Sequence, residues 1–143
     1  MNADAEFSFA LSRETSIPDL IDAAESAGWR FDDDGHLAYV TDADLFDWFT
    51  AAQNAREDVI HELESVRAQG KACGFIMTHH DGDAGCIFIV TDSGTSLIVT
   101  PNKNTVPREG LERFADGEWY LGRLLPIFSG LPLVAYSHSQ DLT

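Results

Sequence analysis

The residues of this sequence that are best suited to chemistry lie close together along the chain, at His79, His80, Asp81 and Asp83. Imidazole and carboxylate groups bind Zn, Mn and Fe in proteins, and the same pair of groups can exchange protons in acid–base catalysis. Adjacent residues of a strand, however, point to opposite faces of the sheet, so two neighbouring histidines are poorly placed to share one ion. The Asp-Gly-Asp stretch also has the composition of a tight turn. We therefore interpret the segment as a structural turn, and a metal-dependent enzyme that uses His79, His80 and Asp83 is the least favoured function.

The other groups that catalysis or cofactor binding commonly uses are poorly placed as well. Cys73 and Cys86 lie in apolar stretches, where burial makes a thiol unreactive. In a hairpin that turns near Gly82, the two cysteines lie several residues apart along the ladder, which is too far for a disulfide. The sequence contains no Gly-x-Ser-x-Gly elbow and no Walker or Rossmann phosphate loop. We predict no catalytic residue, no metal, no cofactor and two reduced thiols.

The elements that position these residues follow from hydrophobic spacing. Apolar residues recur at helical spacing from Ile17 to Ala27, with Thr15 or Ser16 as a capping residue and Gly28 as the end of the helix. Further along the chain, a short helix is expected around residues 109–114. Residues 118–128 allow another helix, which Pro126 would break or kink. Strands are expected at residues 7–11, 29–31, 36–40, 73–79, 85–91, 95–100 and 133–137.

The longest expected element is a helix at about residues 43–69. Thr41 supplies a capping hydroxyl with Asp44 three residues on, and Gly70 ends the helix. Between them an apolar stripe contains Leu45, Phe49, Ala52, Val59, Leu63 and Val66. At about 100° per residue, four carboxylates share another sector of this helix, namely those of Asp44, Asp47, Asp58 and Glu62.

Together these elements predict an α+β fold. A single domain, residues 1–143, would contain a largely antiparallel sheet and two helices in its N-terminal half. The succession from residue 6 to residue 79 is βαββαβ, which is the order of a ferredoxin-like domain with added strands. An α+β domain with antiparallel pairs is the broader expectation, and the ferredoxin-like order is one arrangement within it.

The charge is strongly negative and unevenly distributed. The chain has 143 residues and a formal net charge of −15, with 24 Asp and Glu against 9 Lys and Arg. Residues 1–64 contain 16 acids and 3 bases, which gives −13 of that total. Affinity for nucleic acid and for anionic lipid depends on Lys and Arg, so we expect neither nucleic-acid nor membrane binding. With no targeting segment or apolar run of membrane-spanning length, we expect a cytoplasmic protein.

The acidic half offers a surface for a basic protein partner. Like charges spaced three or four residues apart destabilise a helix, and offsetting Lys or Arg is nearly missing from this half. A purely solubilising surface is the competing interpretation. Tyr39, Phe46 and Trp48 are nearby aromatic residues that suit an interface. The residues predicted to bind the partner are Asp32, Asp33, Asp34, Asp44, Asp47, Trp48, Asp58 and Glu62.

Several stretches give the chain a family resemblance, namely Gly28 with Trp29, residues 32–39, residues 42–48, residues 119–121, and Leu125 with Pro126. In them the chain resembles small acidic bacterial immunity proteins, which neutralise toxins of contact-dependent inhibition and polymorphic-toxin systems. The resemblance extends over most of the chain without a diagnostic motif. It implies a cytoplasmic inhibitor of a cognate toxin, such as a nuclease whose groove is basic. The acidic surface would then replace phosphate and block that groove sterically and electrostatically.

A secretion chaperone is the alternative from another class. A type III-like chaperone is also small, acidic and α+β, but it binds an effector segment through an apolar, dimeric surface. The three apolar strands between residues 73 and 100 would supply that surface. Steep weakening of binding by salt would favour the inhibitor, whereas capture of unfolded segments would favour the chaperone.

Overall fold

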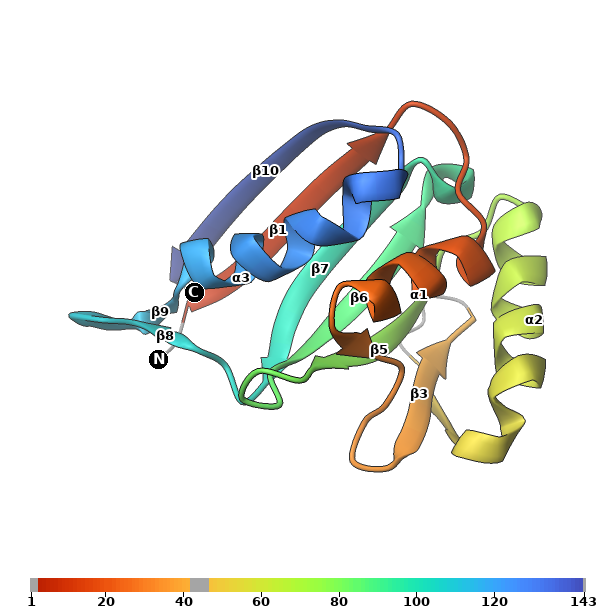
Figure 1. The fold of residues 1–143 in the computed structure, drawn as a ribbon, viewed down its shortest axis with the longest axis horizontal. Coiled ribbons are helices and arrows are strands. Elements are labelled where there is room, and N and C mark those ends of the chain that lie inside the picture. The colour runs from red at the N-terminus through yellow and green to blue at the C-terminus, as the bar shows by residue number, and fades with distance from the viewer. Residues whose placement is uncertain (1–2, 42–46, 143) are drawn as a thin grey trace.

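The computed structural model describes residues 3–41 and 47–142, and within them eight strands form one sheet. These strands are β1 (Ala3–Leu11), β2 (Trp29–Arg30), β3 (His36–Val40), β4 (Phe49–Ala52), β5 (Cys73–His79), β6 (Gly85–Thr91), β7 (Ser96–Lys103) and β10 (Leu133–Leu142). Their order is β10-β1-β7-β6-β5-β3-β4, and β2 pairs with β5 (Figure 1). Every pairing in this sheet is antiparallel.

Helices cover one face of the sheet. The helices α1 (Ile17–Ser26) and α3 (Gly117–Leu124) lie across that face, and α2 (Arg56–Ala68) packs to one side, near β3 and β4 (Figure 1). Within the described residues, no helix is long and apolar enough to cross a membrane. The remaining elements are the 3-10 turns η1 (Gln53–Ala55), η2 (Asp92–Gly94) and η3 (Leu125–Gly130), and a small hairpin of β8 (Pro107–Arg108) and β9 (Leu111–Ala115).

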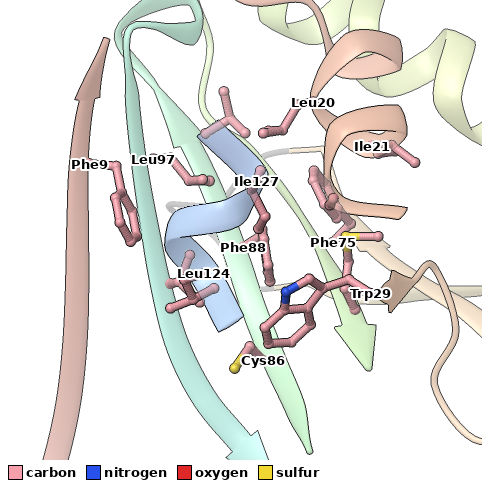
Figure 2. Close-up of a cluster of buried hydrophobic side chains, with 14 of the residues drawn as sticks. Phe9, Leu20, Ile21, Trp29, Phe75, Cys86, Phe88, Leu97, Leu124 and Ile127 are labelled. Atoms are coloured by element: carbon pink, nitrogen blue, oxygen red, sulfur yellow. The ribbon is translucent and has the colours of Figure 1, made fainter. Parts of the chain in front are cut away.

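The hydrophobic core lies between these helices and the sheet, as Figure 2 shows. Alternate residues of β1, β5, β6 and β7 point into it, because successive side chains of a strand face opposite sides. Phe88 of β6 is fully buried. Its ring centroid lies 5.4 Å from that of Trp29 and 5.6 Å from that of Phe75. The core therefore joins the strand after α1 to the central strands of the sheet.

The start of α1 is attached to α2 by one carboxylate. Ser16 caps α1, and the Ile17 N–H donates to Oε1 of Glu64 at 2.9 Å. Arg67 donates to both Glu64 oxygens at 2.7 Å and to the carbonyl of Ser93 at 2.8 Å. These hydrogen bonds hold the pKa of Glu64 below its ordinary value, with the Arg67 hydrogen bond as the largest cause. A negative charge at a helix N-terminus is also favoured by the helix dipole. Glu64 is thus a structural residue rather than part of a binding surface.

Replacing Glu64 with glutamine is expected to lower the free energy of unfolding at neutral pH by about 1–3 kcal/mol, because charge-assisted hydrogen bonds to Arg67 are lost. Since folding lowers the pKa of Glu64, its contribution is present above the ordinary value near 4.5 and disappears as the pH falls through the folded-state value. The difference between wild type and Glu64→Gln should therefore shrink in acid. Urea unfolding at neutral pH and at about pH 3 measures this difference. Glu109→Gln, at an exposed turn, should change stability by less than about 0.5 kcal/mol.

The α+β class and the antiparallel sheet are confirmed, and the ferredoxin-like order is not found. The predicted strands correspond to β1, β2, β3, β5, β6, β7 and β10. However, β1 lies between β7 and β10 and, in the described structure, pairs with no other strand of residues 6–79, whereas in a ferredoxin-like order the strands of that segment would pair with one another. The additional strand β4 also lies between β3 and α2 along the chain. Two helices, α1 and α2, lie in the N-terminal half as predicted. The third helix, α3, corresponds to the helix that residues 118–128 allowed, and it ends before Pro126.

The long helix predicted at residues 43–69 is wrong in its first part. Its beginning lies outside the described residues, and Phe49–Ala52 is the strand β4, paired with β3 from Tyr39↔Phe49 to His36↔Ala52. The helix α2 begins only at Arg56. The physical reason is that β3 offers an unpaired edge, and the backbone hydrogen bonds of that edge outweigh the helix propensity of Ala51 and Ala52. The helix expected at residues 109–114 is also wrong, because these residues belong to the β8–β9 hairpin.

Both thiols are free and buried, in agreement with the prediction of reduced cysteines. Cys73 pairs with Val90, and Cys86 pairs with Met77, so the cysteines are four residues apart along the ladder. Burial raises the pKa of Cys73 to about 12 and raises the pKa of Cys86 as well. Neither thiol is therefore suited to nucleophilic chemistry.

Thiol labelling with DTNB at about pH 8 is expected to be negligible in the folded protein, because a pKa of about 12 leaves only about one Cys73 in ten thousand as thiolate. Two equivalents should react once the chain is unfolded in urea. Rapid labelling of one thiol under native conditions would contradict the buried positions of both cysteines.

Candidate functional site

Six residues of β3, α2, the start of β4 and the two positions before it combine carboxylates with aromatic rings. We call this group the acidic edge, and it consists of Tyr39, Asp47, Trp48, Phe49, Asp58 and Glu62. It lies at one end of the sheet, where β4 is the last strand and α2 packs beside β3 and β4 (Figure 1).

The carboxylates of the acidic edge come from α2 and from the segment before β4. Asp58 and Glu62 are exposed and one helical turn apart, whereas Val59 and Leu63, about 100° further around α2, are buried. Residues spaced by four lie on one helix face. Asp47 is exposed and precedes β4 by two residues, so it does not share a helix with Asp58. The predicted four-carboxylate helical stripe is therefore replaced by three carboxylates from two segments, and Asp44 lies outside the described residues.

The basic residues of α2 do not neutralise this face. Arg56 pairs with Glu25 of α1 at 2.6 Å, and Arg67 is held by Glu64. Within residues 3–41 and 47–142, no Lys or Arg ion pair involves Asp58 or Glu62. The negative charge of this face is thus available to an external cation.

An aromatic pair adjoins these carboxylates through the contact of Tyr39 with Glu62. Phe49 pairs with Tyr39 across the two strands, and their ring centroids are 5.6 Å apart. Phe49 is 49% exposed, although it is a large apolar side chain, and Trp48 beside it is half-buried. Burial raises the pKa of Tyr39, and the charge of Glu62 and a hydrogen bond with it raise this pKa further. The acidic edge therefore presents an apolar centre with a charged surround, the usual anatomy of an interface hot spot.

The three consecutive aspartates form a separate corner next to the start of α2. Asp34 and Gly35 both have positive φ, 53° and 89°, as a type I′ hairpin turn requires. Gln53 donates to Oδ1 of Asp32 at 2.9 Å and so attaches this turn to η1, which directly precedes α2. Lys103 of β7 forms ion pairs with both Asp33 and Asp34. The turn is therefore less negative than its sequence indicates.

Sequence reasoning missed two members of this region. Phe49 had been placed in the apolar stripe of a helix, and Gln53 had no role. A strand at Phe49 could have been expected, because β3 follows a tight Asp-Gly turn and has an open edge. An open edge favours pairing with a further strand. Gln53 could not be identified from one sequence, because its contact with Asp32 depends on how the chain folds back.

The histidine segment is a well-bonded turn. Ligand atoms of His79, His80 and Asp81 lie within 4.8 Å of one another. However, Nδ1 of His79 already accepts from the Asp81 N–H at 3.0 Å, and the Asp81 carboxylate accepts from Arg123 of α3 at 3.1 Å. Asp83 belongs to another contact, with Arg30 at 2.7 Å. The predicted trio of His79, His80 and Asp83 is thus not brought together.

An arginine already lies on one side of this turn. Burial lowers the pKa of His79, with the neighbouring His80 as the next cause. The neutral imidazole that this favours could still bind a metal ion, so it is the Arg123 guanidinium that opposes one. The guanidinium of Arg123 occupies the position beside Asp81 that a cation would need, and it also lies 4.1 Å from the ring centroid of Trp119. The segment joins the β5–β6 turn to α3 and has a structural explanation.

Comparisons of the chain with protein-family models, with curated proteins and with solved structures find no match. Any functional conclusion therefore depends on the acidic edge itself.

Proposed function

We propose that this protein binds a basic partner protein through the acidic edge and blocks it, as an immunity protein blocks a cognate toxin. The observation that carries the proposal is the half-exposed Phe49, which lies against Tyr39 between carboxylates that have no Lys or Arg partner in the described structure. An aromatic anchor supplies binding energy, and the charges around it select a positive surface.

A nuclease-type toxin is the partner that suits this chemistry best. A nuclease must attract phosphate, so its groove is lined with Lys and Arg. Carboxylates presented on a rigid helix and strand can occupy such a groove in place of phosphate. The net charge of −15 would also accelerate encounter with a positive partner at low salt. Inhibition then requires no chemistry from this chain.

The proposal is tested with the product of the gene adjacent to the one that encodes this chain. Expressed alone in a host cell, that product should arrest growth, and co-expression of this protein should restore growth. The purified proteins should form a complex whose affinity falls with added salt. An adjacent product that is harmless and does not bind would refute the proposal. Salt-insensitive binding of an unfolded apolar segment would instead support the secretion chaperone.

A further inference from the structure

The C-terminal strand β10 ends the sheet on the side opposite the acidic edge. Within the described residues it pairs with β1 alone, so its outer row of N–H and C=O groups has no strand partner (Figure 1). The strand is ten residues long, and most of its residues are exposed. Three of the five large hydrophobic side chains exposed in the described structure belong to it, namely Val134, Tyr136 and Leu142.

The two edges of the sheet differ in how they are protected. The edge strand β4 is only four residues long and adjoins the carboxylates of the acidic edge. Short length and charge are the features that prevent edge-to-edge pairing. The strand β10 contains no Lys and no Pro, and Asp141 is its only acid. An edge that is long, apolar and nearly uncharged is typical of a strand that pairs with another strand.

The strand β10 is also held firmly in an extended shape. Its register with β1 is continuous from Ala3↔Leu142 to Ala10↔Ala135. The ring of His138 stacks on that of Phe7 at 4.4 Å, and Gln140 exchanges two hydrogen bonds with the backbone of Ala115, at 2.8 and 2.9 Å. A preorganised strand loses little conformational freedom when it acquires a partner.

We infer that a second copy of this chain covers this edge, with the two β10 strands antiparallel about a two-fold axis near Ser137 and His138. Such pairing is isologous, because each strand offers the other the same surface. The axis places the two Asp141 side chains about 20 Å apart or more, at ~3.3 Å per residue, which exceeds the Debye length of about 8 Å at physiological salt. Two strongly negative molecules can therefore meet here without placing one Asp141 opposite the other.

The near absence of charge on β10 also favours a second copy of this chain, rather than a basic partner protein, at this edge. With Asp141 as its only acid and no Lys or Arg, β10 offers little to a positive surface. A basic partner is drawn to the acidic edge at the other end of the sheet instead. The dimer forms one continuous sheet, and both acidic edges remain at its outer ends. This inference is independent of the proposed function, because it uses a different surface.

Sedimentation equilibrium of the full chain over a hundred-fold dilution series tests the inference. The test variant is Ala135→Glu with Ser137→Glu, at exposed positions that pair with Ala10 and Ser8 of β1, so neither new carboxylate lies directly opposite a charged residue of β1. The matched control is Thr50→Glu with Ala52→Glu on the other edge strand, which adds the same two charges. Circular dichroism and thermal unfolding check that both variants fold.

The wild type and the β4 control are expected at twice the monomer mass. The β10 variant should have a dimer dissociation constant at least about ten-fold higher, because four carboxylates then lie along the pairing strands. A monomeric wild type throughout the series, or a dimer that the β10 substitutions leave unchanged, would overturn the inference. Protection of the β10 amides from hydrogen exchange by a foreign protein, in a monomeric chain, would overturn it as well.

Discussion

Phe88→Ala is expected to lower the free energy of unfolding by about 3–5 kcal/mol, a large part of the stability of a domain of this size. Phe88 is fully buried, and its ring lies against both Trp29 and Phe75, so truncation leaves a cavity between the helices and the sheet. Surrounding side chains relax only partly into such a cavity. Urea unfolding followed by circular dichroism measures the loss.

Phe49→Ala is the matched control, since it removes the same side chain from the acidic edge. Phe49 is 49% exposed, and its main contact is with Tyr39, so the loss should be about 1 kcal/mol or less. Equal destabilisation by the two substitutions would contradict the assignment of Phe49 to a surface. A stable Phe49→Ala protein is also the proper reagent for testing the interface, because any loss of binding cannot then be attributed to unfolding.

Asp58→Lys combined with Glu62→Lys is expected to slow association with the partner by about ten-fold or more at low salt, because the field that steers a basic protein is reversed at the place of contact. Both residues are exposed on α2, so the fold should tolerate the change. Stopped-flow or surface plasmon resonance measures the association rate with the product of the adjacent gene.

The control for this experiment is Glu109→Lys with Glu112→Lys, at exposed positions of the β8–β9 region. It changes the net charge by the same amount, so it separates the effect of total charge from that of position. A smaller effect in the control is expected. If both double variants slow association equally, the location of the acidic edge is refuted even though the attraction to a basic partner would persist.

Much of the fold was predictable because local patterns agree with the tertiary structure. The turn before β3 follows from Asp34 and Gly35, which readily adopt the positive φ that the hairpin needs. The β5–β6 hairpin follows from apolar runs on either side of a turn, and it fixes the separation of Cys73 from Cys86. Ser16 and Pro18 mark the start of α1 in the same way.

The errors occur where non-local contacts decide the structure. Phe49 and Ala52 fit a helical stripe as well as a strand, and only the open edge of β3 favours the strand. Lys103 neutralises Asp33 and Asp34 from about seventy residues away, which composition alone cannot reveal. The acidic character of the first half was therefore predictable from composition, whereas the contact of Phe49 with Tyr39 required the structure.

The salt dependence of the dissociation constant between this protein and the adjacent gene product tests the proposed inhibition most directly. For an interface built on the acidic edge, affinity should fall steeply between low salt and about 0.5 M, where charges are screened within a few ångströms. The Asp58→Lys and Glu62→Lys protein should bind weakly throughout and show a smaller slope. An affinity that is unchanged at about 0.5 M salt, and unchanged by the two reversals, would contradict electrostatic inhibition through this surface.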